Sequence, residues 1–547
     1  MSAPNTRVQS GPANDSKWTF RRHWTVDTTT GPVVGHAENG VTAFRGIPYA
    51  EPPVGNLRFR RARPITPWKE PFIAFHSGDK CVQVKNPKQG VIGSENCLWL
   101  DVIVPTAGHP SATCSEAHSR PVVAFFHGGS NCFGSAANPQ YSAQYLACSL
   151  DAVVVVVNYR IGLLGAMSLG YGDVPGGSSH DRFDTNIQLS DAILALHWIH
   201  DNAAAFGGNP EKLTMMGQSS GGGIVTALTA VPGLDKIVSK AIAMSAAPAT
   251  MVHHPSTSGE WANRLFELYK DPVSASAQEI GRLTHKLNTL GNGFIKYFGP
   301  FSPVLDGDLL SRHPLDLSVA NSALVSSGRT QPQSETKDVR NRNEEGDART
   351  DAGGKIPLLI GTTKNEYYYL QLESVSTSTQ RKRTKFFAES LSNEALDVLK
   401  ESYRNVKSRR DIARFWGDSI FWAPSVRLAE RWLPKNVWMY RLDTTTPFQR
   451  ATAMGAIHTW DLPVLFGRYD VGIGSKALSF GGLQQVKATT ENMQNRWRHF
   501  IHDGDPGFEP YGASRTTHVF DGDTEKLIED PHRELREAWS KVNFDPQ

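Results

Sequence analysis

Short apolar segments alternate with helical patterns along most of the chain. The apolar segments are 122–126, 152–157, 213–216, 241–244, 356–360 and 437–442. Continuous, mostly aliphatic runs bounded by Gly, Asn, Asp or Pro are typical of strands buried on both faces of a parallel sheet. Between the second and third runs, Leu189, Ile193, Leu196 and Ile199 recur at helical spacing, and 493–501 repeats the pattern. This alternation predicts a doubly wound α/β fold, in which a large, mostly parallel central sheet is flanked by helices.

Two segments do not fit the alternation. Residues 326–354 contain one Val, no other large aliphatic residue and no aromatic residue, so they cannot bury enough apolar area to offset the entropy of ordering them. We therefore expect a disordered surface insertion inside one domain, because the chemistry described below requires residues on both sides of it. The mostly polar residues 1–25 predict a disordered N-terminal tail, which leaves 26–540 as a single domain.

Composition narrows the classes of function. The 57 Lys and Arg residues nearly balance the 54 Asp and Glu residues, which leaves no electrostatic footprint for nucleic acid. The longest aliphatic run, 152–157, is far shorter than the ~20 residues of a membrane-spanning helix. No apolar signal segment is seen near the N-terminus, so we expect a cytoplasmic location, with secretion by a non-standard route as the alternative. The sequence carries no metal or nucleotide motif, and we expect no cofactor.

A nucleophile motif directly follows one of the apolar segments. It reads Gly217-Gln218-Ser219-Ser220-Gly221, and an apolar helical stretch comes after it. A serine at a sharp strand-to-helix turn requires small neighbours, because Cβ atoms at the flanking glycines would collide, and the helix N-terminus there favours negative charge. The serine also needs a base that is held by a carboxylate, and among 18 histidines spacing alone does not select one. A plain Gly/Ser loop is the structural alternative.

A second signal lies at the end of segment 122–126. There, His127-Gly128-Gly129-Ser130 offers bare glycine backbone, whose N–H groups can point at an oxygen anion as in an oxyanion hole. Taken alone, the same residues also suit an ordinary glycine turn after a strand.

Several ordered blocks of the sequence carry a family resemblance. The blocks are 44–53 (FRGIPYAEPP), 95–102 (ENCLWLDV), 158–162 (NYRIG) and 206–210 (FGGNP). With them, the chain resembles the type-B carboxylesterase/cholinesterase family of α/β-hydrolases from about residue 26 to 512. The resemblance implies an α/β-hydrolase fold and a serine hydrolase that acts on carboxylic esters.

The resemblance also implies the two partners of the serine. It places the acid at Glu366 and the base at His458, and the order serine, glutamate, histidine along the chain is the one that this fold uses. If Glu366 is not the acid, Asp306 or Asp461 is the next candidate. The family pattern further suggests supporting roles for Ser245 and Asp461, although either residue could be purely structural.

The sequence departs from the family pattern at four places. Ser130 stands where a third glycine is usual, and a left-handed backbone there costs a non-glycine residue about 1–2 kcal/mol. Tyr367 replaces a glycine after the acid and is expected to narrow or reline the pocket. Cys81 and Cys97 correspond to a family disulfide, a pairing that stays open because cytosolic thiols are usually reduced. The loop 81–97 lacks the tryptophan with which cholinesterases bind quaternary ammonium, so a choline ester is a poor candidate.

The predicted function is hydrolysis of a small-molecule carboxylic ester. Ser219 attacks the ester carbonyl, the histidine takes its proton, and the N–H groups of Gly129, Ser130 and Ser220 hold the oxyanion while an acyl-enzyme forms. An acyltransferase that uses another acceptor in place of water is the alternative, and a non-catalytic adhesion or scaffold protein on the same fold is a third hypothesis. Aromatic residues within 415–422 wall either the ester pocket or the core.

Overall fold

The computed structural model describes nine stretches of the chain, and the predicted insertion at 326–354 lies outside them. They are residues 23–84, 90–106, 120–173, 179–248, 252–293, 299–316, 356–372, 374–432 and 435–544. Strand β1 (His23–Thr28) begins inside the segment 1–25 that we expected to be a tail, because Trp24 and Val26 pack against the core. The first strand therefore starts before residue 26, the predicted domain boundary.

One 13-stranded sheet runs through the described residues, in the order β1-β2-β3-β5-β7-β6-β8-β9-β10-β11-β12-β13, with β4 beside β2. Neighbouring strands from β7 to β12 are parallel, and the strands at both ends of the sheet are antiparallel. The other strands are β2 (Gly31–Glu38), β3 (Val41–Pro48), β4 (Phe72–Ile73), β5 (Trp99–Pro105), β6 (Arg120–Phe126), β7 (Val153–Val157), β8 (Gly208–Gln218), β9 (Lys240–Met244), β10 (Leu358–Thr363), β11 (Val437–Leu442), β12 (Thr516–Asp521) and β13 (Thr524–Glu529).

All six apolar segments singled out in the sequence are strands, β6 to β11, and they lie side by side in the sheet. Their side chains divide between two cores, one on each face. In β6, Val122, Ala124 and Phe126 pack in one core, and Val123 and Phe125 pack in the other. Because both faces are buried, these strands need no polar alternation, which explains their continuous apolar runs.

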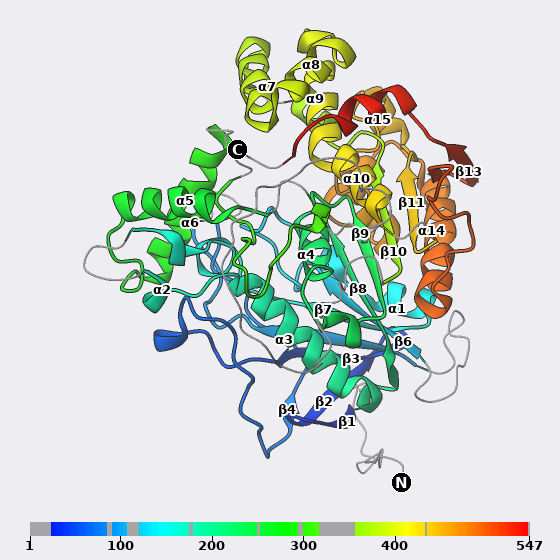
Figure 1. Cartoon of the computed structure of the whole chain (residues 1–547). Coiled ribbons are helices and arrows are strands. Elements are labelled where there is room, and N and C mark those ends of the chain that lie inside the picture. The colour runs from blue at the N-terminus through cyan, green and yellow to red at the C-terminus, as the bar shows by residue number, and fades with distance from the viewer. Residues whose placement is uncertain are drawn as a thin grey trace, which may run out of the picture.

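Helices cover both faces of the sheet (Figure 1). The two predicted helices are α3 (Ile187–Asn202), which packs in one core, and α14 (Leu483–Asp503), which packs in the other. No helix of the described ranges has the length and apolar character needed to cross a membrane. The remaining helices are α1 (Gln144–Leu150), α2 (Ser179–Arg182), α4 (Ser220–Leu228), α5 (Pro255–Leu268), α6 (Ala277–Gly293), α7 (Thr377–Leu391), α8 (Asn393–Ser402), α9 (Arg409–Gly417), α10 (Ala423–Arg431), α11 (Pro447–Ala451), α12 (Asp461–Phe466), α13 (Gly472–Ala477) and α15 (Arg533–Ser540).

The parallel strands bring distant parts of the chain to one edge of the sheet. The candidate oxyanion residues follow β6, the candidate nucleophile follows β8, and the candidate acid follows β10. Carboxyl ends of parallel strands are where open α/β sheets collect functional residues. In Figure 1, helices α7, α8 and α9 stand out at the top of the molecule, with α15 next to them.

Candidate active site

Ser219 occupies a strained turn between β8 and α4. Its backbone φ is 58° and its ψ is −124°, a region that L-residues avoid unless the surrounding structure enforces it. The flanking glycines are required by space: a Cβ on Gly217 would lie 2.3 Å from the carbonyl oxygen of Gly221, and a Cβ on Gly221 would lie 2.1 Å from that of Phe126. The two glycines of the sequence motif are thus a steric requirement of this turn.

His458 bridges the serine and the glutamate. Its Nε2 lies 2.8 Å from Ser219 Oγ, and its Nδ1 lies 2.6 Å from Glu366 Oε2. The backbone N–H of His458 also donates to the carbonyl oxygen of Glu366, at 3.0 Å. The other carboxylate oxygen of Glu366 accepts the N–H of Thr363, at 2.7 Å, which fixes the side chain against the end of β10.

This arrangement has the geometry of a proton relay. A hydroxyl within hydrogen-bond distance of an imidazole can transfer its proton to the ring as the oxygen attacks an electrophile. The carboxylate on the opposite ring nitrogen selects the tautomer in which Nε2 is free to accept that proton. Glu366 is only 3% exposed and His458 11% exposed, so water competes little for these hydrogen bonds.

The glycine loop after β6 lies directly against the nucleophile. A Cβ on Gly128 would be 3.1 Å from the Cβ of Ser219, and a Cβ on Gly129, whose φ is 133°, would be 1.8 Å from the carbonyl oxygen of Phe133. Ser130 has a φ of 52° and is exposed, so this position does require the left-handed backbone that glycine adopts most easily. Within the described ranges, the backbone N–H groups of Gly129, Ser130 and Ser220 have no hydrogen-bond acceptor.

His127 packs against the glycine loop, and in the described residues its ring forms no hydrogen bond with Ser219. Its ring stacks on Tyr159 with centroids 4.5 Å apart, and the hydroxyl of Tyr159 donates to the carbonyl oxygen of His127 at 2.5 Å. Burial lowers the pKa of His127 to about 4, so the ring is neutral at pH 7. Tyr159 belongs to the block 158–162, but its contact with His127 could not be predicted, because the residue comes from the loop after β7.

Asp461, an alternative acid, is close to the site but faces another partner. Its Oδ2 accepts a hydrogen bond of 3.2 Å from Ser245 Oγ. Burial, with the negative charge of Glu366 as the next cause, raises the pKa of Asp461 to about 7. Asp461 therefore holds a proton much more readily than an ordinary aspartate, and in the described residues the imidazole of His458 is bonded to Glu366 and Ser219 and not to Asp461.

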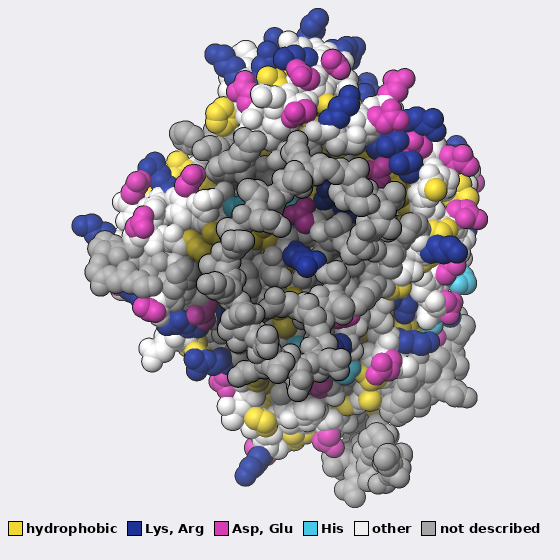
Figure 2. Space-filling view, viewed as in Figure 1, with side chains coloured by type: hydrophobic (Ala, Val, Ile, Leu, Met, Phe, Trp, Pro, Cys, Tyr) yellow, Lys and Arg dark blue, Asp and Glu magenta, His cyan; other side chains and the backbone are white. Residues whose placement is uncertain are grey.

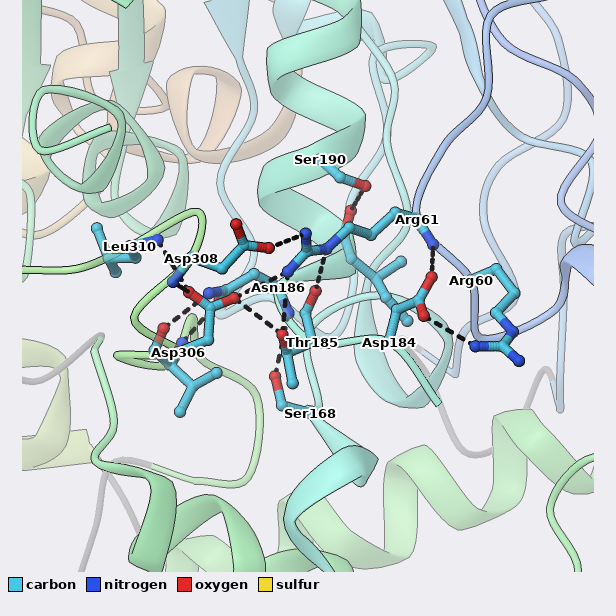
Figure 3. A network of polar contacts seen from close by, with 12 residues as sticks. Arg60, Arg61, Ser168, Asp184, Thr185, Asn186, Ser190, Asp306, Asp308 and Leu310 are labelled. Atoms are coloured by element: carbon cyan, nitrogen blue, oxygen red, sulfur yellow. Dashed lines mark hydrogen bonds and ion pairs between the residues drawn. The ribbon is translucent and has the colours of Figure 1, made fainter. Parts of the chain in front are cut away.

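Asp306, the other alternative acid, belongs to a different region (Figure 3). Its carboxylate accepts hydrogen bonds from the Thr185 hydroxyl at 2.8 Å and from the backbone N–H of Leu310 at 2.9 Å. It also pairs with Arg61, at 3.0 Å. This network ties the segment 306–310 to the loop before α3, and it does not include the serine or His458.

The aromatic residues within 415–422 divide between the neighbourhood of His458 and the core. Phe421 lies against His458, with ring centroids 4.5 Å apart. Tyr367, which replaces the usual glycine, packs 5.7 Å from Phe421 and 6.3 Å from Trp416. Phe415, in contrast, is completely buried in the main core. Phe421 thus lies on one side of the imidazole, and together with Tyr367 and Trp416 it forms an aromatic cluster.

The two cysteines at the positions of the family disulfide, whose pairing the sequence left open, are buried free thiols. A hydrogen bond from Cys81 and burial raise the pKa of Cys97 well above its usual value, so the two side chains are neighbours without a covalent bond. As for metals, no group of three or more His, Cys, Asp or Glu residues in the described ranges is arranged to hold an ion.

Comparison with known proteins identifies the class. The model of the carboxylesterase family matches residues 22–527, and the chain therefore belongs to this family. The predicted family, the α/β-hydrolase fold and the assignment as a carboxylic ester hydrolase are confirmed.

Individual relatives match over nearly their whole length. Para-nitrobenzyl esterase of Bacillus subtilis is 29% identical over 537 residues, which cover 94% of this chain and 98% of that protein. Phenmedipham hydrolase of Pseudarthrobacter oxydans is 28% identical, with 88% of this chain and 90% of that protein covered. Among solved structures, a carboxylesterase of Geobacillus stearothermophilus superimposes with a TM-score of 0.75 at 26% identity, covering 94% of this chain and 99% of that one.

Proposed function

We propose that this carboxylesterase works through an acyl-enzyme on Ser219, with His458 as general base and Glu366 as the acid that orients it. The observation that carries the proposal is the pair of hydrogen bonds through the imidazole, 2.8 Å to the serine and 2.6 Å to the glutamate. As Ser219 Oγ attacks the ester carbonyl, its proton moves to His458 Nε2, which then delivers it to the leaving alcohol. Water repeats the sequence and releases the acid.

The negative charge that develops on the carbonyl oxygen needs donors close to the serine. The N–H groups of Gly129, Ser130 and Ser220 supply them, because they are free of other acceptors in the described structure and two of them lie on the loop that touches Ser219. Donors that are already aimed at the developing oxyanion lower the barrier without reorganisation at the moment of reaction.

An uncharged ester with an aryl or bulky alkyl group is the proposed substrate class. The aromatic cluster of Tyr367, Trp416 and Phe421 beside His458 favours apolar groups through burial and ring stacking. The names of two relatives, para-nitrobenzyl esterase and phenmedipham hydrolase, agree with aryl-bearing substrates. The loop 81–97 has no tryptophan that could bind the quaternary ammonium of a choline ester by a cation–π contact, so a choline ester is not the proposed substrate.

The proposal is tested with the variant Ser219→Ala and the matched control Ser239→Ala, a half-buried serine whose hydroxyl bonds the carbonyl oxygen of Leu213. We expect Ser219→Ala to lower kcat on a p-nitrophenyl ester by roughly 10⁴- to 10⁶-fold with an unchanged Tm, and Ser239→Ala to stay within threefold of the parent. Mass spectrometry of the acylated active-site peptide identifies the nucleophile. Acylation of another residue, or full activity of Ser219→Ala, would contradict the proposal.

The hydrolase is separated from the acyltransferase alternative by its products. With an alcohol acceptor present at millimolar concentration, a hydrolase should still release mainly free acid, because water is present at far higher concentration. Predominant formation of the new ester would identify an acyltransferase.

A further inference from the structure

A cavity opens beside the candidate acid, at the carboxyl end of β10. Its volume is about 430 Å³, which is within the ~300–1,000 Å³ of small-molecule sites. The turn 362–366, helix α9, the π-helical turn Asp418–Trp422, Arg441 of β11 and the beginning of α15 contribute to its walls. Ser219 and His458 do not line it, so the cavity is distinct from the candidate catalytic site although Glu366 belongs to both.

The lining of this cavity is predominantly cationic. Its cations are Lys364, Arg404, Arg410, Arg414 and Arg441, and its carboxylates are Glu366, Asp411 and Asp418. Since Glu366 is already bonded to His458, two carboxylates remain on the walls for five cationic groups. A concave surface of one charge sign concentrates ions of the opposite sign.

Three of the cations have firm partners. Arg404 pairs with Asp411 at 2.7 Å. Arg441 and Lys364 share the carboxylate of Asp443, at 2.6 Å and 2.8 Å. These ion pairs hold the guanidinium and ammonium groups at the cavity wall while leaving some of their N–H donors unused.

The two arginines on α9, Arg410 and Arg414, are one helical turn apart and are not held in this way. Arg414 lies 3.6 Å from Asp418, beyond normal hydrogen-bond distance. Arg410 has no carboxylate partner in the described residues, and its guanidinium carbon lies 5.7 Å from the ring centroid of Tyr368. Burial raises the pKa of Asp418 to about 6, which leaves this carboxyl partly protonated near neutral pH. Both arginines therefore have donors to offer an anion.

The rest of the wall suits the organic part of a ligand. Tyr368, Trp422 and Leu535 provide apolar surface next to the arginines. Thr363, which is 3% exposed, also lines the cavity, and its hydroxyl oxygen has no hydrogen-bond partner among the described residues. A molecule with an anionic head and a small apolar body would satisfy both kinds of surface.

The segment that carries α9 has an excess of positive charge. Residues 377–418, which include α7, α8 and α9, contain ten Lys and Arg against six Asp and Glu, whereas the whole chain has a net charge of only +3. Figure 2 shows dark-blue Lys and Arg side chains, with acidic ones between them, over the top of the molecule where these helices lie. Such a surface speeds the approach of anions.

We infer that this cavity, between α9 and the turn after β10, is a binding site for a small organic anion, a carboxylate or phosphate attached to an aryl or alkyl group. Arg410 and Arg414 hold the anionic head, since guanidinium groups match both oxyanions with paired N–H donors. Tyr368 and Trp422 contact the apolar part. The site goes beyond the proposed ester hydrolysis, because it needs neither the serine nor the histidine.

The test measures binding to the full chain by isothermal titration calorimetry with benzoate, phenyl phosphate and the neutral benzamide. We expect one or both anions to bind and benzamide to bind at least tenfold more weakly. Arg410→Gln and Arg414→Gln should each weaken the binding of the anion by about tenfold or more, since each removes a charged hydrogen-bond donor. Lys382→Gln is the matched control: it removes a cation from exposed α7 that does not line the cavity, and it should leave the affinity unchanged.

Each result of these titrations either supports the inferred anion site or overturns it. Binding of benzoate alone identifies a carboxylate site, and binding of phenyl phosphate alone identifies a phosphate site. The inference is overturned if neither anion binds at millimolar concentration, if benzamide binds equally well, or if the two arginine variants retain the parental affinity. If the anions bind next to Ser219 instead, the arginine variants should keep the parental affinity. The variants therefore distinguish binding near Ser219 from binding in the cavity. Tm values measured without ligand show whether the variants are folded.

Discussion

Glu366 and Asp306 are two buried carboxylates with nearly equal exposure and different surroundings. Their side chains are 3% and 2% exposed, and backbone N–H groups bond both. The partners of Asp306 in Figure 3 are a hydroxyl, amide N–H groups and a guanidinium, none of which changes its protonation state near neutral pH. The partner of Glu366 is an imidazole that is in turn bonded to Ser219.

The comparison shows that burial and hydrogen bonding do not by themselves mark a catalytic acid. A carboxylate among permanent donors fixes two segments of the chain to one another. A carboxylate on an imidazole stabilises the positive charge that appears when the ring accepts a proton. The partner decides which of these roles the acid has, and the following predictions test that conclusion from the largest expected effect to the smallest.

Exchanging each acid for its amide should separate the two roles. We expect Glu366→Gln to lower kcat by about 10⁴-fold, because the amide no longer stabilises the imidazolium or fixes its tautomer. Asp306→Asn should keep kcat within threefold of the parent. Steady-state kinetics on one p-nitrophenyl ester provide the measurement, and a reversed pattern would make Asp306 the acid.

In stability, the order of the two variants should be reversed, with Asp306→Asn showing the larger effect. Asp306→Asn removes the charge that pairs with Arg61 and leaves an amide N–H₂ facing Thr185, so we expect a loss of about 1–3 kcal/mol in the free energy of unfolding. Thermal unfolding followed by circular dichroism reports it as a lower Tm. If the Tm does not change, the network in Figure 3 contributes nothing to stability and the contrast with Glu366 is lost.

A third buried acid, Asp461, sharpens the comparison through pH. Its pKa of about 7 in the folded protein lies above the ordinary value of 3.8, so between pH 4 and 7 the native state keeps a proton that the unfolded chain has released. The contribution of Asp461 to stability therefore falls as the pH rises through this window. Asp461→Asn removes the effect while an amide oxygen still accepts from Ser245. We expect its Tm relative to the parent to rise from pH 5 to pH 8, and a flat difference would contradict the raised pKa.

The smallest effect is expected at Ser130, which touches neither acid. Because its φ is 52°, glycine would relieve about 1–2 kcal/mol of backbone strain and free space beside the ester. We expect Ser130→Gly to broaden tolerance for bulky esters and to change kcat for acetyl esters by less than tenfold. A uniform loss of about 10²- to 10³-fold would instead indicate that the Ser130 hydroxyl donates to the oxyanion.

Much of the fold and part of the site follow from local sequence. The six apolar runs correctly predicted strands of the parallel sheet, because a strand buried on both faces must be apolar at every position. The glycines around Ser219 were predicted for the right reason, since their Cβ atoms would meet backbone atoms within about 2.3 Å. Glu366 and His458 were carried over from the family pattern and not from their own surroundings. The cytoplasmic location and the disorder of 326–354 stay predictions.

Sequence alone therefore determined the strand pattern, the nucleophile turn and the family, because each depends on residues that lie close together along the chain. Tertiary structure decided the partners: His458 meets Glu366 across 92 positions and Ser219 across 239. It also decided that Phe421 lies against the imidazole, that Asp306 is bonded to Arg61, and that cations from the turn after β10, from α9 and from β11 face one cavity. Such contacts depend on the order of the strands in the sheet and on the paths of the loops between them. No local pattern of residues encodes that order.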